Sequence, residues 1–498
     1  MKFFNVSFSL ALAAGVLWVG VANAGTNDLL VKFKDAPSLG QFTMSTQAAG
    51  NKVENLGGGN WVRVQLENKK SLTSNMEQLR ANPNVVTVQP NYPLHIFEDY
   101  RAKDPAVRAK FEKFVDLDRA IHARVLDNPP IPERPAIPTH GSGGKGADPE
   151  FVHQWGMNDI GIKAGWKYGT GKGITVAVID TGVDYTHEDL VDNLWHNAGE
   201  MGTDAQGRDK ATNGVDDDAN GFVDDVIGWD FVTNDGKPFD ITVDPMVIIT
   251  GGGNPGHGTH CAGNVGAKAD NGKGVAGVAP DAKIMVLRFL NEKGQGDTAG
   301  GVKAINYAVK MGAKVLSNSW GSEGEDPAQG AENQALRDAI TSAQAAGVLF
   351  IAAAGNGHSG SGYDNDTDGK PGIPASFPYD NIISVAAIDS NDQLGGFSNW
   401  GAKTVHIAAP GVKVFSTIVG GKYSDTVIDM YGIVATWDGT SMAAPHVAGA
   451  AAAYWSKHPS ASYKDVKAAI LSSSKPLSVL QGKTVSGGKL NVENLMSR

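Results

Sequence analysis

The spacing of apolar and polar positions divides the chain into three parts, of which residues 25–97 are the first. This part contains the segments "DLLVKFKD", "NWVRVQLEN", "SLTSNMEQLRANP" and "NVVTVQPNYPLHI". Strand-like alternation and helix-like spacing follow each other here, which predicts a small α+β domain. Residues 104–128 then have helical spacing, and five prolines occupy residues 129–138. Because Pro-rich and Gly-rich segments are extended and exposed, residues 98–147 are predicted to be a helical and Pro/Gly-rich linker that a protease can cut.

The third part begins near residue 148, where buried-strand patterns alternate with helical ones. Examples are "GITVAVIDTG", "AKIMVLRFL", "GGVKAINYAVKMGAKVLSNSW" and "QALRDAITSAQAAGVLFIAAAGN". Apolar strands separated by helices predict a parallel α/β sheet that is covered on both faces. In such sheets the active groups gather at the carboxyl ends of the strands.

The first 24 residues resemble a secretory signal peptide. Lys2 precedes an apolar run that ends in the small residues Ala22 and Ala24, as signal peptides do. A membrane anchor is the alternative, but small residues and then "GTND" follow the apolar run. No later segment has the roughly 18 consecutive apolar residues of a spanning helix. We therefore expect a secreted, extracellular protein with no stable membrane anchor.

Cysteine usage and charge narrow the possible partners. Cys261 is the only cysteine, so an exported chain must take its rigidity from packing or metal ions. The net charge is -10, and residues 204–244 hold eleven aspartates against Arg208, Lys210 and Lys237. This clustering argues against nucleic acid as a partner and favours cations.

The segment "DDDANGFVDD", residues 216–225, resembles a calcium-binding loop. Oxygen side chains occupy alternate positions and Gly221 is the sixth residue, although Ile227 replaces the glutamate expected at position twelve. A solvated acidic loop is the alternative, but packed carboxylates repel each other unless a cation binds. The predicted side-chain ligands are Asp216, Asp218, Asn220 and Asp224, with Asp225 as a substitute for Asp224.

The segment "WDGTSMAAPHVAGAAAAYW" begins with turn-forming residues and continues with small apolar ones. Ser441 lies where the two parts meet. Ser441 or Thr440 could simply cap the predicted helix. The other interpretation is that Ser441 is a nucleophile at a helix N-terminus, where developing negative charge is favoured. That role requires a base and an orienting acid elsewhere in the chain.

Asp180 and His257 are the candidates for these two partners. Asp180 ends the strand "TVAVID", and His257 begins another small-residue helix in "GHGTHCAG". Taken singly, each is more often a cap, turn or core residue. His257 and His260 would need a third ligand to bind zinc, and their spacing is not HExxH. His260 is therefore interpreted as structural.

Three long stretches, "VIDTGVD", "HGTHCAG" and "GTSMAAPHVAG", resemble the subtilisin-like serine protease family in the order Asp, His, Ser. The likeness extends over residues 148–475, and the preceding domain resembles the family's pro-region. It implies a three-layer parallel-sheet catalytic domain, residues 148–498, preceded by a small ferredoxin-like α+β pro-domain, residues 25–97, and a signal peptide, residues 1–24.

The resemblance also implies the catalytic roles. Ser441 would attack the scissile carbonyl and His257 would transfer the proton, while Asp180 would orient the imidazole. Asn356 in "FIAAAGNG" matches the family's oxyanion asparagine, with the Ser441 amide as the second donor. The implied activity is serine endopeptidase activity through an acyl-enzyme intermediate, in a self-processing precursor whose pro-domain is an intramolecular inhibitor.

Substrate binding is implied by the same resemblance. Ser319, Trp320 and Gly321 match the segment along which the family binds an extended peptide as an added strand. Trp320 could equally be a core aromatic. Ala354 and Gly355 belong to one predicted pocket wall, and "GIPAS", with the family's cis proline position at Ile373-Pro374, forms the other. These segments contain no acidic residue, so we expect a broad preference for apolar or aromatic side chains before the cleaved bond.

Family likeness suggests a second structural calcium site at Asp148, Asp189 and Asn271. Asp230 and Asp235 suggest a third site, but Thr233 occupies a position where thermitase-like members of the family have a carboxylate. Structural calcium would supply rigidity that a chain with one cysteine cannot obtain from an internal disulfide. The Cys261 thiol has no base of its own and is therefore interpreted as a packing residue.

Two rival functions come from other classes. A catalytically inactive subtilase fold could be a binding module, and a calcium-dependent surface protein would explain the acidic loop but not the three catalytic stretches. Within the protease interpretation, a degradative enzyme is favoured over a dedicated processing enzyme. The expected partners are protein and peptide substrates, and the chain is expected to be monomeric.

Overall fold

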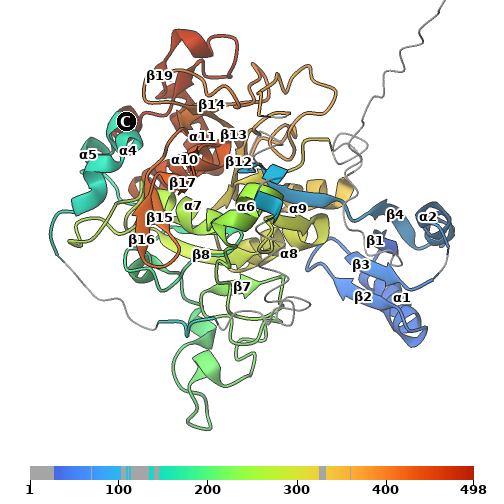
Figure 1. Cartoon of the computed structure of the whole chain (residues 1–498). Helices are drawn as coiled ribbons and strands as arrows, with labels where there is room; N and C mark the ends of the chain where they lie inside the picture. Colours follow the sequence, from blue (N-terminus) through green and yellow to red (C-terminus); the bar gives the residue numbers. More distant parts are fainter. Residues whose placement is uncertain are drawn as a thin grey trace, which may run out of the picture. The chain divides into compact units, whose positions relative to one another are not determined.

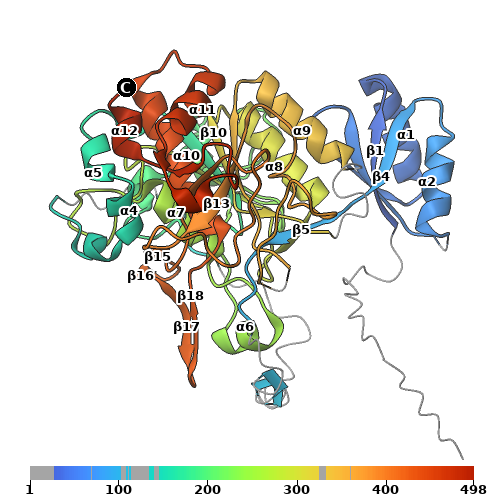
Figure 2. The same ribbon diagram turned by 90° about the horizontal axis from the view of Figure 1, so that it is seen from above.

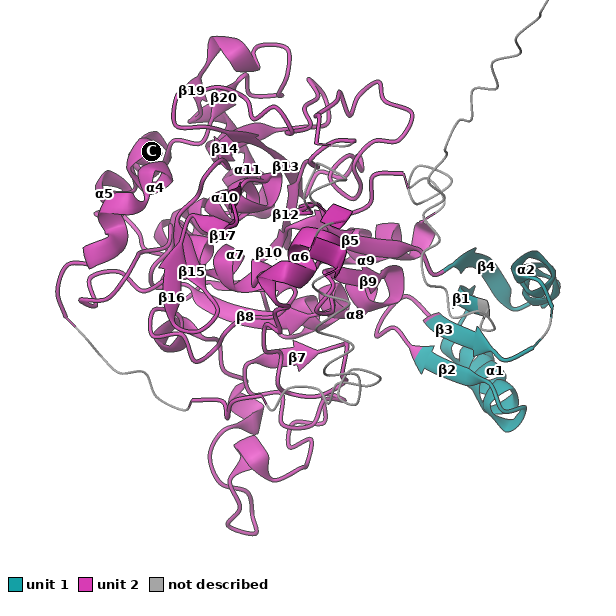
Figure 3. Cartoon of the chain, viewed as in Figure 1, with its two compact units in different colours: residues 1–54, 62–90 teal, residues 55–61, 91–498 magenta. Residues whose placement is uncertain are grey.

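The computed structural model describes residues 27–68, 70–101, 108–109, 111–113, 134–138, 145–324, 333–358 and 360–498. The chain forms two compact units, one of residues 1–54 and 62–90 and the other of residues 55–61 and 91–498 (Figure 3). The predicted signal peptide and most of the predicted linker helix lie outside the described residues.

The small unit has the element order βαββαβ, which is that of ferredoxin-like folds. Its elements are β1 (Asn27–Phe33), α1 (Ala36–Ala48), β2 (Lys52–Asn55), β3 (Trp61–Leu66), α2 (Leu72–Arg80) and β4 (Val85–Pro90). The strands form one sheet in the order β2-β3-β1-β4. Alternate residues of β1, namely Leu29, Val31 and Phe33, point into its apolar core. The prediction of a small α+β domain is confirmed.

A nine-stranded sheet forms the centre of the large unit, in the order β19-β20-β14-β13-β12-β10-β6-β8-β7 (Figure 1). Its strands are β6 (Thr175–Asp180), β7 (Gly228–Asp230), β8 (Lys283–Arg288), β10 (Val315–Asn318), β12 (Leu349–Ala353), β13 (Ile382–Ile388), β14 (Ile407–Pro410), β19 (Lys475–Pro476) and β20 (Gly488–Lys489). Neighbouring strands are parallel except β19 and β20. The central strands are fully buried because helices cover both faces.

Helices on the two faces complete the predicted three layers (Figure 2). The helices are α4 (Trp155–Asp159), α5 (Ile162–Gly165), α6 (Pro245–Gly251), α7 (His257–Gly266), α8 (Thr298–Lys310), α9 (Gln334–Ala345), α10 (Thr440–Lys457), α11 (Tyr463–Ser472) and α12 (Val492–Met496). Helices α7 and α10 pack together on one face, and α8 and α9 pack together on the other. Among the described residues, no helix is long and apolar enough to cross a membrane.

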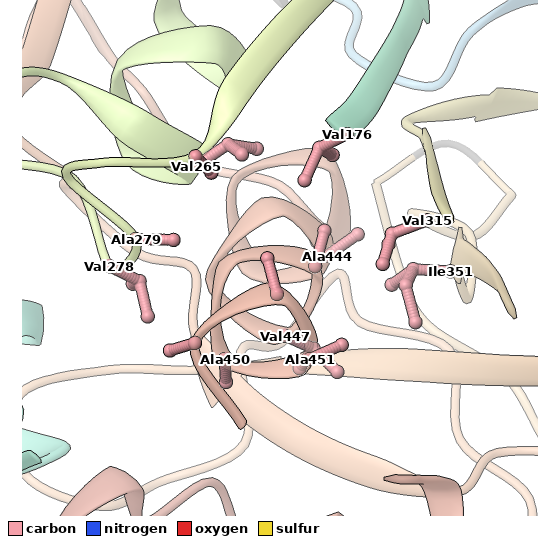
Figure 4. Packing of buried hydrophobic residues seen from close by; sticks show 14 of the residues in the cluster. Val176, Val265, Val278, Ala279, Val315, Ile351, Ala444, Val447, Ala450 and Ala451 are labelled. Carbon is pink, nitrogen blue, oxygen red and sulfur yellow. The ribbon is translucent and has the colours of Figure 1, made fainter. Parts of the chain in front are cut away.

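Helix α10 is the core helix of the large unit, and its small residues explain how it fits there. Its Ala444, Val447 and Ala451 lie among valines and isoleucines of the sheet and of α7 (Figure 4). A Cβ at Gly449 would lie 2.6 Å from the Cβ of Val278. Small side chains therefore let the helix approach its neighbours closely.

Short strands outside the main sheet complete the unit. Strand β5 (Pro93–Ile96) lies between β11 (Trp320–Gly321) and β9 (Gln295–Asp297) in a three-stranded sheet. Two hairpins are formed by β15 (Ser416–Ile418) with β16 (Lys422–Ser424), and by β17 (Thr426–Met430) with β18 (Ile433–Thr436). Short 3-10 helices occupy Pro149–His153, Val191–Asn193, Ala198–Glu200, Lys210–Thr212 and Ser478–Leu480.

Candidate active site

Asp180 and His257 meet at the carboxyl edge of the main sheet. Asp180 ends β6 and His257 begins α7, and His257 Nδ1 lies 2.7 Å from Asp180 Oδ1. A side chain at Gly258 would collide with the Gly182 carbonyl oxygen, which lies 2.1 Å from an ideal Cβ. Glycine therefore lets the start of α7 approach the end of β6. The Asn254 side-chain oxygen caps this helix by accepting from the His257 backbone N–H at 2.9 Å.

Both members of this pair are buried, and the acidic neighbours of His257 favour its charged form despite the burial. Burial alone would lower the pKa of His257, but the Asp180 carboxylate and neighbouring acidic groups raise it well above its usual value. The Nδ1–H donates to Asp180, which leaves Nε2 directed away from the aspartate. That arrangement is the one a general base needs.

Ser441 is the second residue of α10 and lies in the first turn of that helix. Its Oγ donates to the Ser319 carbonyl oxygen at 3.2 Å, and the Ser319 hydroxyl donates to the Ser441 carbonyl oxygen at 2.9 Å. The Cys261 side chain lies between the two segments, with its Sγ 3.4 Å from the Ser441 backbone carbonyl oxygen and 4.0 Å from His257 Nδ1. Three segments far apart in sequence are thereby brought together.

Asn356 follows β12 and is held in one orientation. Its Oδ1 accepts from both the backbone N–H and the hydroxyl of Thr440 at 2.9 Å. The Nδ2 group is consequently aimed into the site, where it can donate to a negative oxygen. This orientation suits the predicted oxyanion role.

The chain's own residues occupy the predicted substrate position. In strand β5, Ile96 pairs with Trp320 and His95 with Gly321, while β9 pairs along its other edge. The Phe97 ring comes next and lies against Gly321, where an ideal Cβ would be 2.4 Å from Phe97 Cζ. The absence of a side chain at Gly321 therefore makes room for an aromatic ring.

Sequence reasoning did not find Glu98, whose carboxylate lies between the candidate catalytic groups. Its Oε2 lies 3.1 Å from His257 Nε2, and its Oε1 accepts from Asn356 Nδ2 at 2.9 Å. The side chain is 1% exposed. Burial favours a raised pKa, but the His257 charge and the hydrogen bonds from His257, Ser441 and Asn356 lower the pKa of Glu98. The only sequence signal was an acidic residue directly after the apolar segment "LHIF".

The pocket walls contain one acidic neighbour that was not predicted. Gly355 has φ +109°, and an ideal Cβ there would lie 2.5 Å from Glu323 Oε1. That oxygen accepts hydrogen bonds from the Gly357 amide, Asn399 and Tyr363. Burial raises the pKa of Glu323. Because three donors already bond this carboxylate, it does not require a basic substrate side chain.

Trp320 is fully buried and its ring contacts Phe289 and Phe350, so its side chain is a core aromatic while its backbone pairs with Ile96. The Ile373-Pro374 peptide bond is cis. Ala354 is fully buried beside Gly355.

The structure brings together Asp148, Asp189 and Asn271. Asp148 accepts from the Asn271 backbone N–H at 3.1 Å, and Asp189 Oδ1 accepts from Asn271 Nδ2 at 2.8 Å. Burial raises the pKa of both carboxyl groups. A bound cation would offset this cost, since it favours the charged form.

The acidic loop brings together a different set of residues from the predicted one. Carboxylate oxygens of Glu200, Asp218 and Asp225 lie within 4.8 Å of one another. Burial raises the pKa of Glu200 to about 7, and its Oε2 is buried without a hydrogen-bond partner among the described residues. Asn220 donates to Asp225 at 2.8 Å.

The other predicted ligands of the loop have different contacts. Asp224 has φ +52° and accepts from the Gly214 N–H, so it is engaged away from the cluster that Asp225 joins. Asp216 bonds the backbone N–H groups of Asn220 and Gly221. Glu200, sixteen residues before the loop, is the member that sequence reasoning missed.

The doubtful third cation position holds arginine instead. Arg134 Nη1 donates to Asp230 at 3.1 Å and to Thr233 at 3.0 Å, and Nη2 donates to Asp235 at 2.6 Å. Arg288 also pairs with Asp230 at 2.8 Å. A guanidinium therefore supplies the positive charge at this position.

His260 and Cys261 have surroundings that fit their predicted structural roles. Burial lowers the pKa of His260 to about 3, and its ring stacks on Trp437 at 4.2 Å between centroids. Burial raises the pKa of Cys261 to about 11. The thiol is therefore protonated at neutral pH and is a poor nucleophile.

These contacts define the class of the protein, a serine endopeptidase built on a parallel α/β sheet. A family model described as the Subtilase family (Peptidase_S8) matches residues 171–492. The chain belongs to this family, which confirms the resemblance seen in its sequence. Thermitase of Thermoactinomyces vulgaris is 35% identical over 324 residues, covering 65% of this chain and 89% of that protein. Subtilisin DY of Bacillus licheniformis is 38% identical over 240 residues, covering 48% of this chain and 76% of that protein.

Several relatives are considerably longer than the region that they share with this chain. A thermophilic serine proteinase of Bacillus sp. (strain AK1) is 34% identical over 301 residues, covering 60% of this chain. The match spans 57% of that relative.

Proposed function

We propose that the chain is the secreted precursor of a calcium-stabilised serine endopeptidase that hydrolyses peptide bonds of proteins. The observation that carries this proposal is the buried contact between Asp180 and His257 near Ser441, next to the extended strand β5 that pairs with Trp320 and Gly321. Residues 1–24, which lie outside the described part of the chain, would direct export. The likeness of those residues to a signal peptide supports that step.

Each candidate catalytic residue has its own role in the proposed hydrolysis of the peptide bond. Ser441 Oγ attacks the scissile carbonyl carbon while His257 Nε2 takes the hydroxyl proton, and Asp180 stabilises the imidazolium. The oxyanion accepts from Asn356 Nδ2. The imidazolium then protonates the leaving amine, and the peptide C–N bond breaks to leave a Ser441 ester. Water, deprotonated by His257, hydrolyses that ester and regenerates the serine hydroxyl.

Serine-directed phosphonate labelling tests this activity directly. The phosphonate should attach to Ser441 in the mature protein, and the same preparation should digest an unfolded protein. A catalytically inactive binding module would take up no label. Labelling without any peptide-bond cleavage would overturn the endopeptidase proposal.

Asn356→Ala should reduce kcat by about 10²- to 10³-fold, the range known for the corresponding change in subtilisin. The reason is that Asn356 Nδ2 would donate to the oxygen only as it becomes negative, so KM should change little. Steady-state kinetics on a peptide amide measures both constants. A raised KM with unchanged kcat would contradict the oxyanion role.

The proposed maturation follows from the segment bound in the cleft. With residues 93–96 paired as a substrate strand and Phe97 against Gly321, the peptide bond that follows Phe97 adjoins the catalytic groups. We therefore assign self-cleavage to the Phe97-Glu98 bond. The pro-domain would inhibit until it is cut away and released, because its C-terminal residues occupy the proposed substrate position.

Two groups of oxygen-bearing side chains in the large unit are suited to binding calcium. Glu200, Asp218 and Asp225 offer converging oxygens, and the unpartnered Glu200 Oε2 is an acceptor that a cation would satisfy. Asp148, Asp189 and Asn271 offer a second oxygen-rich site. Bound calcium would neutralise these carboxylates and so stabilise the fold, with no part in the chemistry.

Calcium removal should therefore lower Tm. At a calcium concentration 100 times Kd, one site adds about 2.7 kcal/mol of stability. Asp225→Asn should remove most of this gain, whereas Asp224→Asn, the neighbouring control, should not. Thermal unfolding with calcium and with chelator measures the difference. Equal calcium-dependent shifts in both variants would contradict the cluster as the site.

A further inference from the structure

We propose that the enzyme has a pocket for an aromatic side chain on the third residue after the cleaved bond. In the precursor this pocket holds Tyr100. The inference rests on the proposed function, because it takes the Phe97-Glu98 bond as the position of cleavage. It adds a binding site on the leaving-group side of the cleft, where no substrate contact has been assigned.

The path of the chain through the cleft places Tyr100 in this position. Strand β5 ends at Ile96, Phe97 lies against Gly321, and Glu98 reaches His257. The Asp99 side chain is 54% exposed. Tyr100 then turns inward and is only 8% exposed. The side chains after Phe97 therefore alternate in, out and in, as in an extended peptide.

The pocket is apolar and adjoins the catalytic centre. The Tyr100 ring meets the Trp437 ring edge-on, with centroids 6.0 Å apart at 75°. The buried cluster around it consists of Tyr100, Phe111, Ile248, Ile249, Cys261, Val414, Ile428, Trp437 and Met442. Cys261 and Met442 belong to the same helix starts as His257 and Ser441. A side chain bound here is therefore held close to the reacting bond.

Two projecting elements form the outer part of this surface. Helix α6 contributes Ile248 and Ile249, and the β17–β18 hairpin contributes Ile428. Both elements project from the same side of the large unit (Figure 2). Phe111 packs against Tyr431 on the hairpin, with ring centroids 5.5 Å apart. The precursor thus covers this apolar surface with aromatic residues from its own segment beyond the cleavage point.

The surroundings of Tyr100 indicate which substrate side chain the pocket prefers. Its hydroxyl oxygen is buried and has no hydrogen-bond partner among the described residues. A buried hydroxyl without a partner costs free energy, so the pocket favours the ring and not the hydroxyl. Cutting the Phe97-Glu98 bond leaves residues 98–113 as the free N-terminal segment of the mature chain, so a substrate side chain can displace Tyr100 from the ring of Trp437 and the α6 isoleucines. The expected ligand is Phe, with Tyr no better.

The test uses internally quenched peptides with the sequence of residues 94–101 and the change Glu98→Ala. Three peptides carry Phe, Tyr or Ala at the position of Tyr100. The mature wild type should cleave the Phe peptide with a kcat/KM about tenfold above that of the Ala peptide, and the Tyr peptide no faster than the Phe peptide. Trp437→Ala should bring the Phe-to-Ala ratio close to one, and Trp437→Phe should restore part of it.

Val434→Ala is the matched control, because Val434 is 64% exposed and lies on the same hairpin. It should keep the wild-type ratio. Equal cleavage of all three peptides by the wild type would overturn the pocket, as would an equal loss on every peptide in Trp437→Ala. An amide substrate that ends in a chromogenic leaving group after Phe tests the activity separately. If the wild type does not cleave it, the proposed function itself fails, and the pocket inference fails with it.

Discussion

The Ser441→Ala precursor should remain full length and digest no protein, while the wild type loses its pro-region and becomes active. Ser441, the second residue of α10, is the proposed nucleophile, so its loss removes the covalent step. The expected loss in kcat is about 10⁶-fold, the magnitude known for subtilisin. Mass spectrometry of both chains in calcium, with an assay on an unfolded protein, measures the two effects together.

The control for this experiment is Ser460→Ala, because Ser460 is exposed and lies outside the site. It should mature and digest protein as the wild type does. If Ser441→Ala is trimmed like the wild type but digests nothing, the catalytic role stands and self-maturation is contradicted. If both precursors stay intact and inert, an outside activating protease or the binding-module alternative replaces self-processing.

Glu98→Gln should accelerate self-cleavage of the precursor by about 10²-fold. The carboxylate of Glu98 forms an ion pair with His257 and occupies the Asn356 donor, so it blocks both the base and the oxyanion position. Breaking a buried ion pair typically costs about 3–5 kcal/mol, and 1.4 kcal/mol corresponds to a factor of ten. Glutamine keeps the shape without the charge, and therefore weakens this inhibitory contact. A time course of precursor loss by mass spectrometry measures the rate.

The pH dependence gives the same prediction a second readout. The raised pKa of His257 means that its imidazole stays protonated below that value and becomes a base only as the pH rises through it. Wild-type self-cleavage should therefore still accelerate at alkaline pH, and Glu98→Gln should shift this profile to lower pH. Asp99→Asn, the exposed neighbour, is the control and should leave the profile unchanged. The inhibitory role is wrong if Glu98→Gln and Asp99→Asn give the same profile and rate.

Much of the fold could be predicted because it follows from local patterns. Buried strands alternating with helices predicted the parallel sheet covered on both faces, and the mixed strand-like and helix-like segments of residues 25–97 predicted a small α+β unit. Asp180, His257 and Ser441 were candidates because each stands at the end of a strand or the start of a helix, and the resemblance of their three stretches to the subtilisin-like family implied their catalytic roles. Their catalytic roles stay a prediction until Ser441 is tested.

The residues that were missed depend on contacts between distant segments. Nothing local to "HIFEDY" indicates that Glu98 reaches His257 or that Tyr100 meets Trp437, because the pairing of β5 with β11 fixes both placements. Asp225, and not its neighbour Asp224, joins Asp218 because the backbone at Asp224 is left-handed and turns its side chain towards Gly214.

By itself, the sequence determined the layers, the family and the candidate catalytic residues of this protein. These features depend on the periodicity of apolar positions and on residues within a few places of one another. Only the tertiary structure decided which segment fills the cleft, which carboxylates converge and which aromatic residue lies beyond the cleaved bond. These contacts depend on strand pairing and side-chain direction between segments that are far apart in the sequence. A local sequence pattern therefore does not predict them.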